Sequence, residues 1–118
     1  MSFEAEVLWP RYAGLWSADA GTRAAAMPEY LDGAVSYSDP NIALSGLAAF
    51  DDYMAGFQRA MPGCRFEIDR VLSHYGRSLA WWRLCDAGGK TLQHGVSTAR
   101  HVADGRLAEI AGFFPVDR

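Results

Sequence analysis

The segment from Tyr37 to Gly46 holds the side chain best placed to do chemistry, the carboxylate of Asp39. An apolar run at residues 34–35 predicts a strand that ends at Asp39, and an amphipathic helix pattern begins near Leu47. Pro40 restricts the backbone directly after Asp39. A half-buried carboxylate in such a position can act as a base in proton transfer. The alternative is that Asp39 and Pro40 only form a turn, where both residue types are common.

Helices in the first half of the chain are expected to position this carboxylate. Apolar residues at helical spacing predict a helix over Phe3–Ala18, a second over Thr22–Leu31, and a third introduced by Ser45-Gly46 that runs to about Met61. Pro10 interrupts the first pattern, so that helix could begin near Trp9. Pro62-Gly63 ends the third helix.

The second half of the chain alternates between apolar and polar residues with a period of two, which is typical of strands. The predicted strands are Cys64–His74, Ser78–Asp86, Thr91–Val102 and Arg106–Phe114, joined by glycine-containing turns. Helices come first and antiparallel strands last. This order predicts a single α+β domain over residues 1–118, with the helices on one face of the sheet.

Composition favours a small-molecule pocket over a charged partner. Half of the 118 residues are hydrophobic and 13% are aromatic, enough to build a core and to line a cavity. The net charge of −3 and the scattered arginines argue against nucleic-acid binding. No apolar run reaches the ~20 residues of a membrane span, and the N-terminus does not resemble a signal peptide.

Cysteine and histidine placement predicts reduced thiols and no metal site. Cys64 and Cys85 lie apart in apolar runs, which favours a cytoplasmic protein with free cysteines. His74, His94 and His101 are isolated and lack the paired spacing of metal ligands. We expect His74 and His101 at the surface, and no cofactor.

Taken in order, several short motifs resemble the SnoaL-like branch of the nuclear transport factor two superfamily over nearly the whole chain. These motifs are Arg11-Tyr12, Ser38-Asp39-Pro40, Ser45-Gly46, Met61-Pro62-Gly63, the run Val102–Leu107 and the run Ile110–Phe114. The resemblance implies a curved antiparallel sheet that the N-terminal helices wrap into a cone. It also implies one pocket opening into the interior, and commonly a homodimer.

Ketosteroid isomerases and polyketide cyclases within this superfamily imply roles for individual residues. Asp39 matches the carboxylate that shuttles a proton, and Tyr12 matches the tyrosine that donates to the developing oxyanion. A further acid usually stands six residues before the aspartate of the Asp-Gly turn, and counting back from Asp104 gives Thr98. A threonine can donate a hydrogen bond but cannot share a proton as a carboxyl group does. The alternative for Tyr12 is an ordinary aromatic residue of the helix face.

Strand alternation adds further candidates for the pocket. If Thr98 faces the pocket, His94 and Arg100 face it too, provided that no bulge breaks the register. Arg100 could bind a carboxylate or an enolate, and His94 could act as a second acid or base; either could instead be a surface residue. Trp82 shares a face with Ala80 and Leu84 and could form an apolar wall. Two more aromatic candidates complete the predicted pocket, Trp16 and Phe114.

The sequence thus favours a cofactor-independent enzyme of the isomerase or cyclase type, acting on a small, largely apolar carbonyl compound. Asp39 would be the base and Tyr12 the oxyanion donor. Two other functions stay open. The pocket could bind a small hydrophobic ligand without catalysis, or the chain could be a dimeric structural or interaction module.

Overall fold

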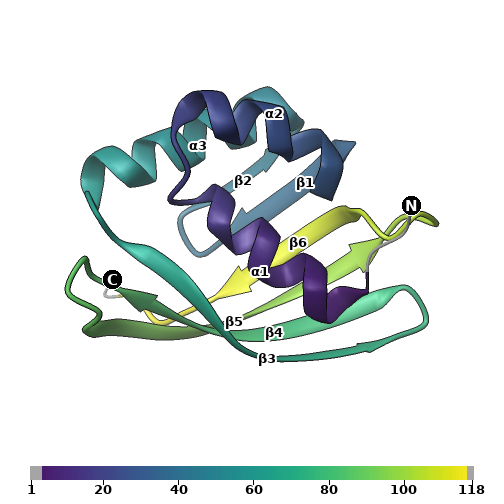
Figure 1. The fold of residues 1–118 in the computed structure, drawn as a ribbon. Coiled ribbons are helices and arrows are strands. Elements are labelled where there is room, and N and C mark those ends of the chain that lie inside the picture. The colour runs from purple at the N-terminus through teal and green to yellow at the C-terminus, as the bar shows by residue number, and fades with distance from the viewer. Residues whose placement is uncertain (1–3, 117–118) are drawn as a thin grey trace.

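Three helices lie on the concave face of a curved sheet of six strands in this computed structural model, which describes residues 4–116 (Figure 1). In chain order the elements are α1 (Ala5–Leu15), α2 (Ala20–Tyr30), β1 (Leu31–Asp39), β2 (Ile42–Ser45), α3 (Leu47–Ala60), β3 (Arg65–His74), β4 (Arg77–Cys85), β5 (Thr91–His101) and β6 (Leu107–Phe113). None of the described helices is long and apolar enough to cross a membrane.

The strands follow the order β2-β1-β6-β5-β4-β3 across the sheet. Strands β1 and β6 run parallel, whereas the other neighbouring pairs are antiparallel. The predicted α+β class and the curved sheet wrapped by helices are confirmed. The sheet is mixed rather than wholly antiparallel, because the chain returns through α3 and four further strands before β6 pairs with β1.

Helix α1 carries its apolar residues on the face that meets the sheet. Leu8, Tyr12 and Leu15 recur at helical spacing and are all buried. The helix begins at Ala5, so the alternative start near Trp9 is wrong; Phe3, the predicted start, lies outside the described residues. Pro10 is accommodated inside the helix on its exposed side, where the carbonyl group that it leaves without a partner can meet water.

Helices α2 and α3 are joined by a buried arginine. Asp19 caps α2 by accepting a hydrogen bond from the Thr22 amide, 2.9 Å away. Arg23, in the next turn, is 2% exposed and lies 2.6 Å from Asp51 of α3. Its guanidinium also donates to the carbonyl oxygen of Ala18. This buried ion pair fixes the two helices above β1, and so fixes the helix that carries Tyr53.

Strand β2 was not predicted from the sequence. It is four residues long, mostly exposed, and pairs with β1 through a hairpin in which Asp39 lies opposite Ile42. An exposed edge strand of this length has no buried face to produce an alternating pattern. Its presence turns the segment after Asp39 into a two-residue loop, Pro40-Asn41, instead of a longer connection.

Candidate active site

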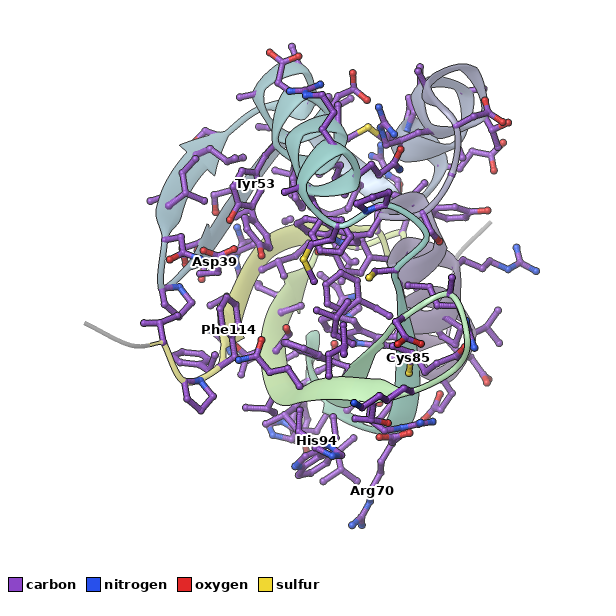
Figure 2. The ribbon with its side chains drawn as sticks, turned by 90° about the vertical axis from the view of Figure 1, so that its left-hand side faces the viewer. Asp39, Tyr53, Arg70, Cys85, His94 and Phe114 are labelled. Atoms are coloured by element: carbon purple, nitrogen blue, oxygen red, sulfur yellow. The ribbon has the colours of Figure 1, made fainter. Side chains whose placement is uncertain are left out.

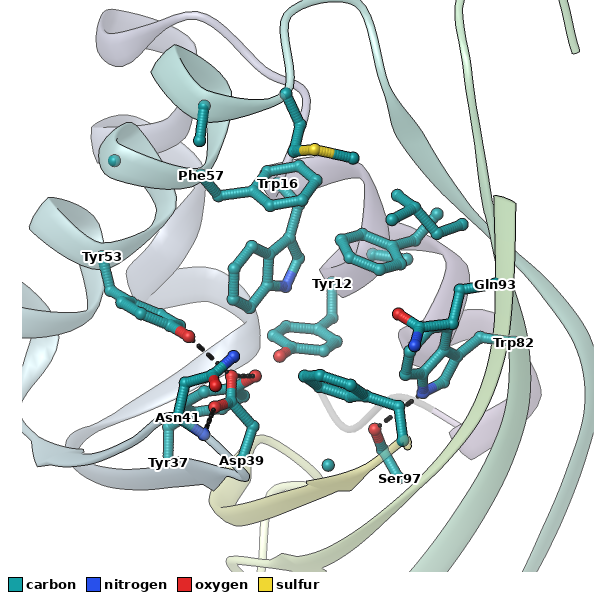
Figure 3. Close-up of a pocket in the computed structure, with 18 of the residues that line it drawn as sticks. Tyr12, Trp16, Tyr37, Asp39, Asn41, Tyr53, Phe57, Trp82, Gln93 and Ser97 are labelled. Carbon is teal, nitrogen blue, oxygen red and sulfur yellow. Dashed lines mark hydrogen bonds between the residues drawn. The ribbon is translucent and has the colours of Figure 1, made fainter. Parts of the chain in front are cut away.

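A cavity of about 490 Å³ lies between the helices and the concave face of the sheet (Figure 3). Figure 3 shows four polar residues gathered at one side of it, Tyr37, Asp39, Asn41 and Tyr53. Much of the remaining wall is apolar, and includes Phe57, Met61, Phe66, Ile68, Leu84 and Phe114. The arrangement suits a ligand that is apolar over most of its surface and polar at one end.

Asp39 faces this cavity and is held by three hydrogen bonds. The hydroxyl groups of Tyr37 and Tyr53 both donate to its Oδ2 atom, at 2.7 and 2.8 Å. The Asn41 amide donates to Oδ1 at 2.8 Å, which closes the hairpin loop as an Asx turn. Both interpretations of Asp39 therefore hold: it shapes the turn and it also lines the cavity. Oδ1 keeps a lone pair for a ligand.

Tyr12 differs from Tyr37 and Tyr53, the other two tyrosines of the cavity, in the hydrogen bond that its hydroxyl group can donate. Its hydroxyl is buried, and Trp16 acts as its side-chain hydrogen-bond partner. The indole group of Trp16 can only donate, so the Tyr12 oxygen accepts that bond and keeps its own proton for another acceptor. Within residues 4–116 no protein acceptor takes that proton, whereas Tyr37 and Tyr53 give theirs to Asp39. Tyr12 is thus available to donate to a ligand.

All three phenols stay protonated at neutral pH. Burial raises the pKa of Tyr12 well above its ordinary value, with a smaller contribution from the negative charge of Asp39. Burial also raises the pKa of Tyr37, and the neighbouring Tyr12 and Asp39 add to the effect. For Tyr53, burial and the hydrogen bond to Asp39 raise the pKa. Neutral phenols beside a carboxylate can serve as hydrogen-bond donors but not as bases.

The opposite wall of the cavity depends on Trp82 and on small residues around it. The Trp82 indole donates to Ser97 Oγ at 3.0 Å, and its ring packs edge to face against Phe66 and Phe114. Gly95 of β5 makes this placement possible, because a Cβ atom there would lie 2.1 Å from the Trp82 ring. Gly112 of β6 pairs with Ser97 and leaves space between Ser97 and Asp39.

The structure brings five of the predicted site residues together and separates three from them. The five that line the cavity are Tyr12, Trp16, Asp39, Trp82 and Phe114. His94, Thr98 and Arg100 do not line it. Their side chains are exposed, and Figure 2 shows His94 far from Asp39, on the outer side of the sheet. Their predicted place in the pocket is wrong.

The error was one of strand parity in β5. Ser97 and Ala99 are the buried residues of this strand, and the side chains between them point outward. The outward set includes the larger apolar side chains, Leu92 and Val96, so the apolar pattern alone indicated the wrong face. The inward-facing residues have small side chains because Trp82 and the helices fill the space above them. Ser97, rather than Thr98, is the hydroxyl that β5 presents to the cavity.

Six polar residues of the cavity were missed by sequence reasoning: Tyr37, Asn41, Asp52, Tyr53, Gln93 and Ser97. Tyr37 could have been found, because it lies two residues before Asp39 and therefore on the same face of the strand. Tyr53 lies one turn from both Phe50 and Phe57 on the apolar side of α3, so helical spacing also indicated its direction.

A second hydrogen-bonded chain lies outside this group of polar residues. The Trp9 indole donates to Ser78 Oγ at 2.8 Å, and Ser78 Oγ lies 2.7 Å from His101 Nε2. The other ring nitrogen of His101 is 2.7 Å from the carbonyl oxygen of Gly105, which can only accept. In the neutral imidazole, Nε2 therefore accepts from Ser78. His101 was expected at the surface; it is half-buried within this chain, while His74 is exposed.

Comparisons with known proteins agree with this fold and cavity. A proposed isomerase of the SnoaL-like family from Agrobacterium tumefaciens is 20% identical, with a TM-score of 0.86 over 93% of this chain and 96% of that one. A SnoaL-like protein of unknown function from Burkholderia thailandensis is 18% identical, with a TM-score of 0.73 over 95% of each chain. A proposed ketosteroid isomerase from Kribbella flavida is 22% identical, with a TM-score of 0.67 over 95% and 78%.

These identities are low, so the likeness to solved structures shows the fold alone. No curated protein sequence matches the chain. The family model of the SnoaL-like domain matches residues 11–110, which include Tyr12, Asp39, Tyr53 and most of the sheet. The chain belongs to the SnoaL-like family.

Proposed function

We propose that the protein is a cofactor-independent enzyme of the isomerase or cyclase type that enolises a small, largely apolar carbonyl compound. The observation that carries the proposal is the pairing of two groups in one apolar cavity. The carboxylate of Asp39 is available as a base, and Tyr12 is the phenol whose proton is not already given to Asp39. Enolisation needs these two functions together.

In the proposed reaction, the carbonyl oxygen of the substrate accepts a hydrogen bond from Tyr12. Asp39 removes a proton from the carbon next to the carbonyl group, and the electron pair of that C–H bond moves to form the enolate. Tyr12 stabilises the charge on oxygen. The proton then returns to a different carbon, which completes an isomerisation. Alternatively, the enolate carbon attacks a second carbonyl group of the substrate, which closes a ring, and the alkoxide so formed takes up the proton held by Asp39. Ser97, separated from Asp39 by Gly112, supplies a further donor.

A non-catalytic binding domain is the second candidate, and one observation favours it. Asp39 accepts three hydrogen bonds and shapes the hairpin loop, which are sufficient reasons for a carboxylate at this position without catalysis. The same cavity would then hold a small hydrophobic ligand whose polar end meets Tyr12.

Deuterium incorporation from solvent separates the two candidates. The substrates would be a panel of ketones and β-dicarbonyl compounds, followed by NMR in deuterated buffer. We expect Asp39→Asn to slow exchange by about 10²–10⁴-fold, and Tyr12→Phe by about 10²–10³-fold. Glu29→Gln and Tyr75→Phe change exposed residues outside the cavity and serve as matched controls.

Exchange that is equally fast in Asp39→Asn would contradict the role of Asp39 as base. Exchange at the uncatalysed rate in the wild-type protein, together with measurable binding of the same compounds, would establish the binding domain instead. Thermal unfolding of each variant shows whether it remains folded.

We propose a homodimer, for which sedimentation equilibrium should give twice the mass of the chain. We also propose a cytoplasmic location, which is consistent with Cys64 and Cys85 being buried and free of a disulfide bond. Fractionation of cells that express a tagged protein tests the location.

A further inference from the structure

The cavity is acidic as well as aromatic. Two carboxylates line it, Asp39 and Asp52, and within residues 4–116 no lysine, arginine or histidine side chain does. Arg100, the residue expected to bind an acidic substrate, lies on the outer side of the sheet. The negative charge of the lining therefore has no positive counterpart in the wall, and a cleft of one sign favours ligands of the other.

Four arginines of the described residues form ion pairs with acids that do not line the cavity. Arg23 of α2 forms an ion pair with Asp51 of α3. The other ion pairs lie at the sheet or in its loops: Arg65 with Glu67, Arg83 with Asp69, and Arg106 with both Asp32 and Asp104. Arg59 of α3 comes nearest to the cavity: its guanidinium lies 3.7 Å from the position of a Cβ atom on Gly56, a lining residue, although Arg59 itself does not line the cavity.

Tyr53 adjoins one acid of the cavity in sequence and is hydrogen-bonded to the other. Asp52 precedes Tyr53 on α3, both residues line the cavity, and the Tyr53 hydroxyl lies 2.8 Å from Asp39. Asp52 is exposed, and no ion pair of the described residues includes it. Asp39 is supplied with neutral donors only, which leaves its charge uncompensated.

Aromatic rings surround this acidic side. Trp16 lies within 6 Å, centroid to centroid, of both Tyr37 and Tyr53, and it contacts Phe57 on its other side. The face of an aromatic ring carries negative potential and attracts cations, including quaternary ammonium groups. Carboxylates and ring faces together favour a positive charge in the cavity.

We propose that this cavity selects its ligands by charge, and that it takes ammonium-bearing compounds before neutral ones of the same shape and rejects carboxylates. The inference rests on the part of the proposed function that makes the cavity the ligand site. It narrows the substrate class to carbonyl compounds that carry a positive charge, with neutral ones second.

Three acetophenones of nearly the same shape test this selection. They are the 4-trimethylammonio compound, its neutral 4-tert-butyl isostere and 4-acetylbenzoate. Calorimetric titration of the full chain should give the cation an affinity about tenfold higher than that of the tert-butyl compound. The carboxylate should bind at least about tenfold more weakly than the neutral compound, and added salt should reduce both differences.

Charge-removing variants identify the source of the selection. Asp52→Asn changes an exposed residue and should fold normally, and it should reduce the preference for the cation several-fold; Asp39→Asn should do the same. Glu29→Gln removes the same charge from the exposed side of α2 and should leave the preference unchanged. Equal affinities for the three compounds, tighter binding of the carboxylate, or no binding of any of them would overturn the inference. A preference unchanged in both aspartate variants would do so too.

The same compounds separate this inference from the proposed enzyme, because all three carry an enolisable methyl ketone. Deuterium exchange into the acetyl group without a charge preference would overturn only the charge selection. A preference for the cation without exchange would overturn only the enzyme and leave an acidic binding site.

Discussion

Two tryptophan indoles in this protein donate to serine hydroxyls, at two positions along β4. Trp9 of α1 donates to Ser78, and Trp82 of β4 donates to Ser97 on the neighbouring strand. Both serines are less than a tenth exposed. The pairs differ in what comes next. Ser78 donates a hydrogen bond to His101, whose other ring nitrogen is bonded to the Gly105 carbonyl oxygen, whereas Ser97 lines the cavity.

The same hydrogen bond from an indole to a serine can thus contribute to stability at one position and to ligand binding at another. Around Ser78 the chain of donors and acceptors is completed by the protein itself, so its loss should be felt as lost stability. The hydroxyl group of Ser97 faces the cavity, so a ligand there can accept its hydrogen bond. The group Tyr37–Asp39–Tyr53 combines both, because the carboxylate is held by the protein and still faces the cavity.

The largest expected effect separates the two tryptophans. Trp9→Ala should lower the free energy of unfolding by about 3–5 kcal/mol, the usual cost of removing a buried aromatic side chain. Both rings border the cavity, but Trp9 is 1% exposed and Trp82 is 8% exposed, so Trp82→Ala should cost less. Urea denaturation of both variants measures this. An equal or larger cost for Trp82→Ala would contradict the comparison.

Substitution of the two serines should affect different properties, stability for Ser78 and ligand affinity for Ser97. Ser78→Ala leaves the buried Trp9 donor and His101 without their partner, and should cost about 1–3 kcal/mol of stability. Ser97→Ala should cost about 1 kcal/mol or less, since water in the cavity can replace the hydroxyl. Only Ser97→Ala should change the affinity for 4-tert-butylacetophenone. A change of affinity in Ser78→Ala would show that the first chain also reaches the ligand.

Alkaline pH should weaken the tyrosine group before other parts of the protein. The folded protein raises the pKa of Tyr12 and Tyr37 above the value of about 10 in the unfolded chain. The contribution of these two neutral phenols to the free energy of unfolding is therefore fully present below about pH 10. It is lost as the pH rises further, by up to about 1.4 kcal/mol per pH unit for each phenol. Tyr37→Phe should flatten the decline measured by denaturation at pH 9–11. An unchanged slope would show that Tyr37 titrates normally when folded.

The smallest expected effect concerns Tyr53. Tyr53→Phe should lower stability by about 1 kcal/mol or less, because the tyrosine is only half-buried and Asp39 keeps its bonds from Tyr37 and Asn41. Its effect on deuterium exchange should be larger than its effect on stability, since Asp39 would lose one of the groups that orient it. Tyr75→Phe, at a fully exposed tyrosine, is the control. A loss of several kcal/mol would place Tyr53 in the structural group instead.

Local patterns predicted most of the fold. The end of β1 at Asp39 was predicted correctly because proline acts on the residue directly before it. The four strands after Cys64 were predicted to within about two residues at each end, because glycine turns separate them and β4, β5 and β6 each contain buried residues. The parallel pairing of β1 with β6 has no local signal, since the two strands are far apart in sequence.

The site was predicted less completely because it depends on which face of each strand points inward. Asp39 and Tyr12 were found from position along the chain, and they do face one cavity. Thr98 and Arg100 were assigned inward by counting from a turn, whereas packing under Trp82 selected the set with small side chains. A one-residue change of parity moves every side chain of a strand to the other face.

Gly95 gives the cavity a means of changing size without any change in the residues that line it. The glycine is not part of the lining, yet the ring of Trp82 lies directly over it. Any larger residue at position 95 would push that ring inward or aside. Substrate range in this chain and its relatives could therefore diverge through a residue that never touches the substrate, and a designer could adjust it there while leaving Asp39 and Tyr12 in place.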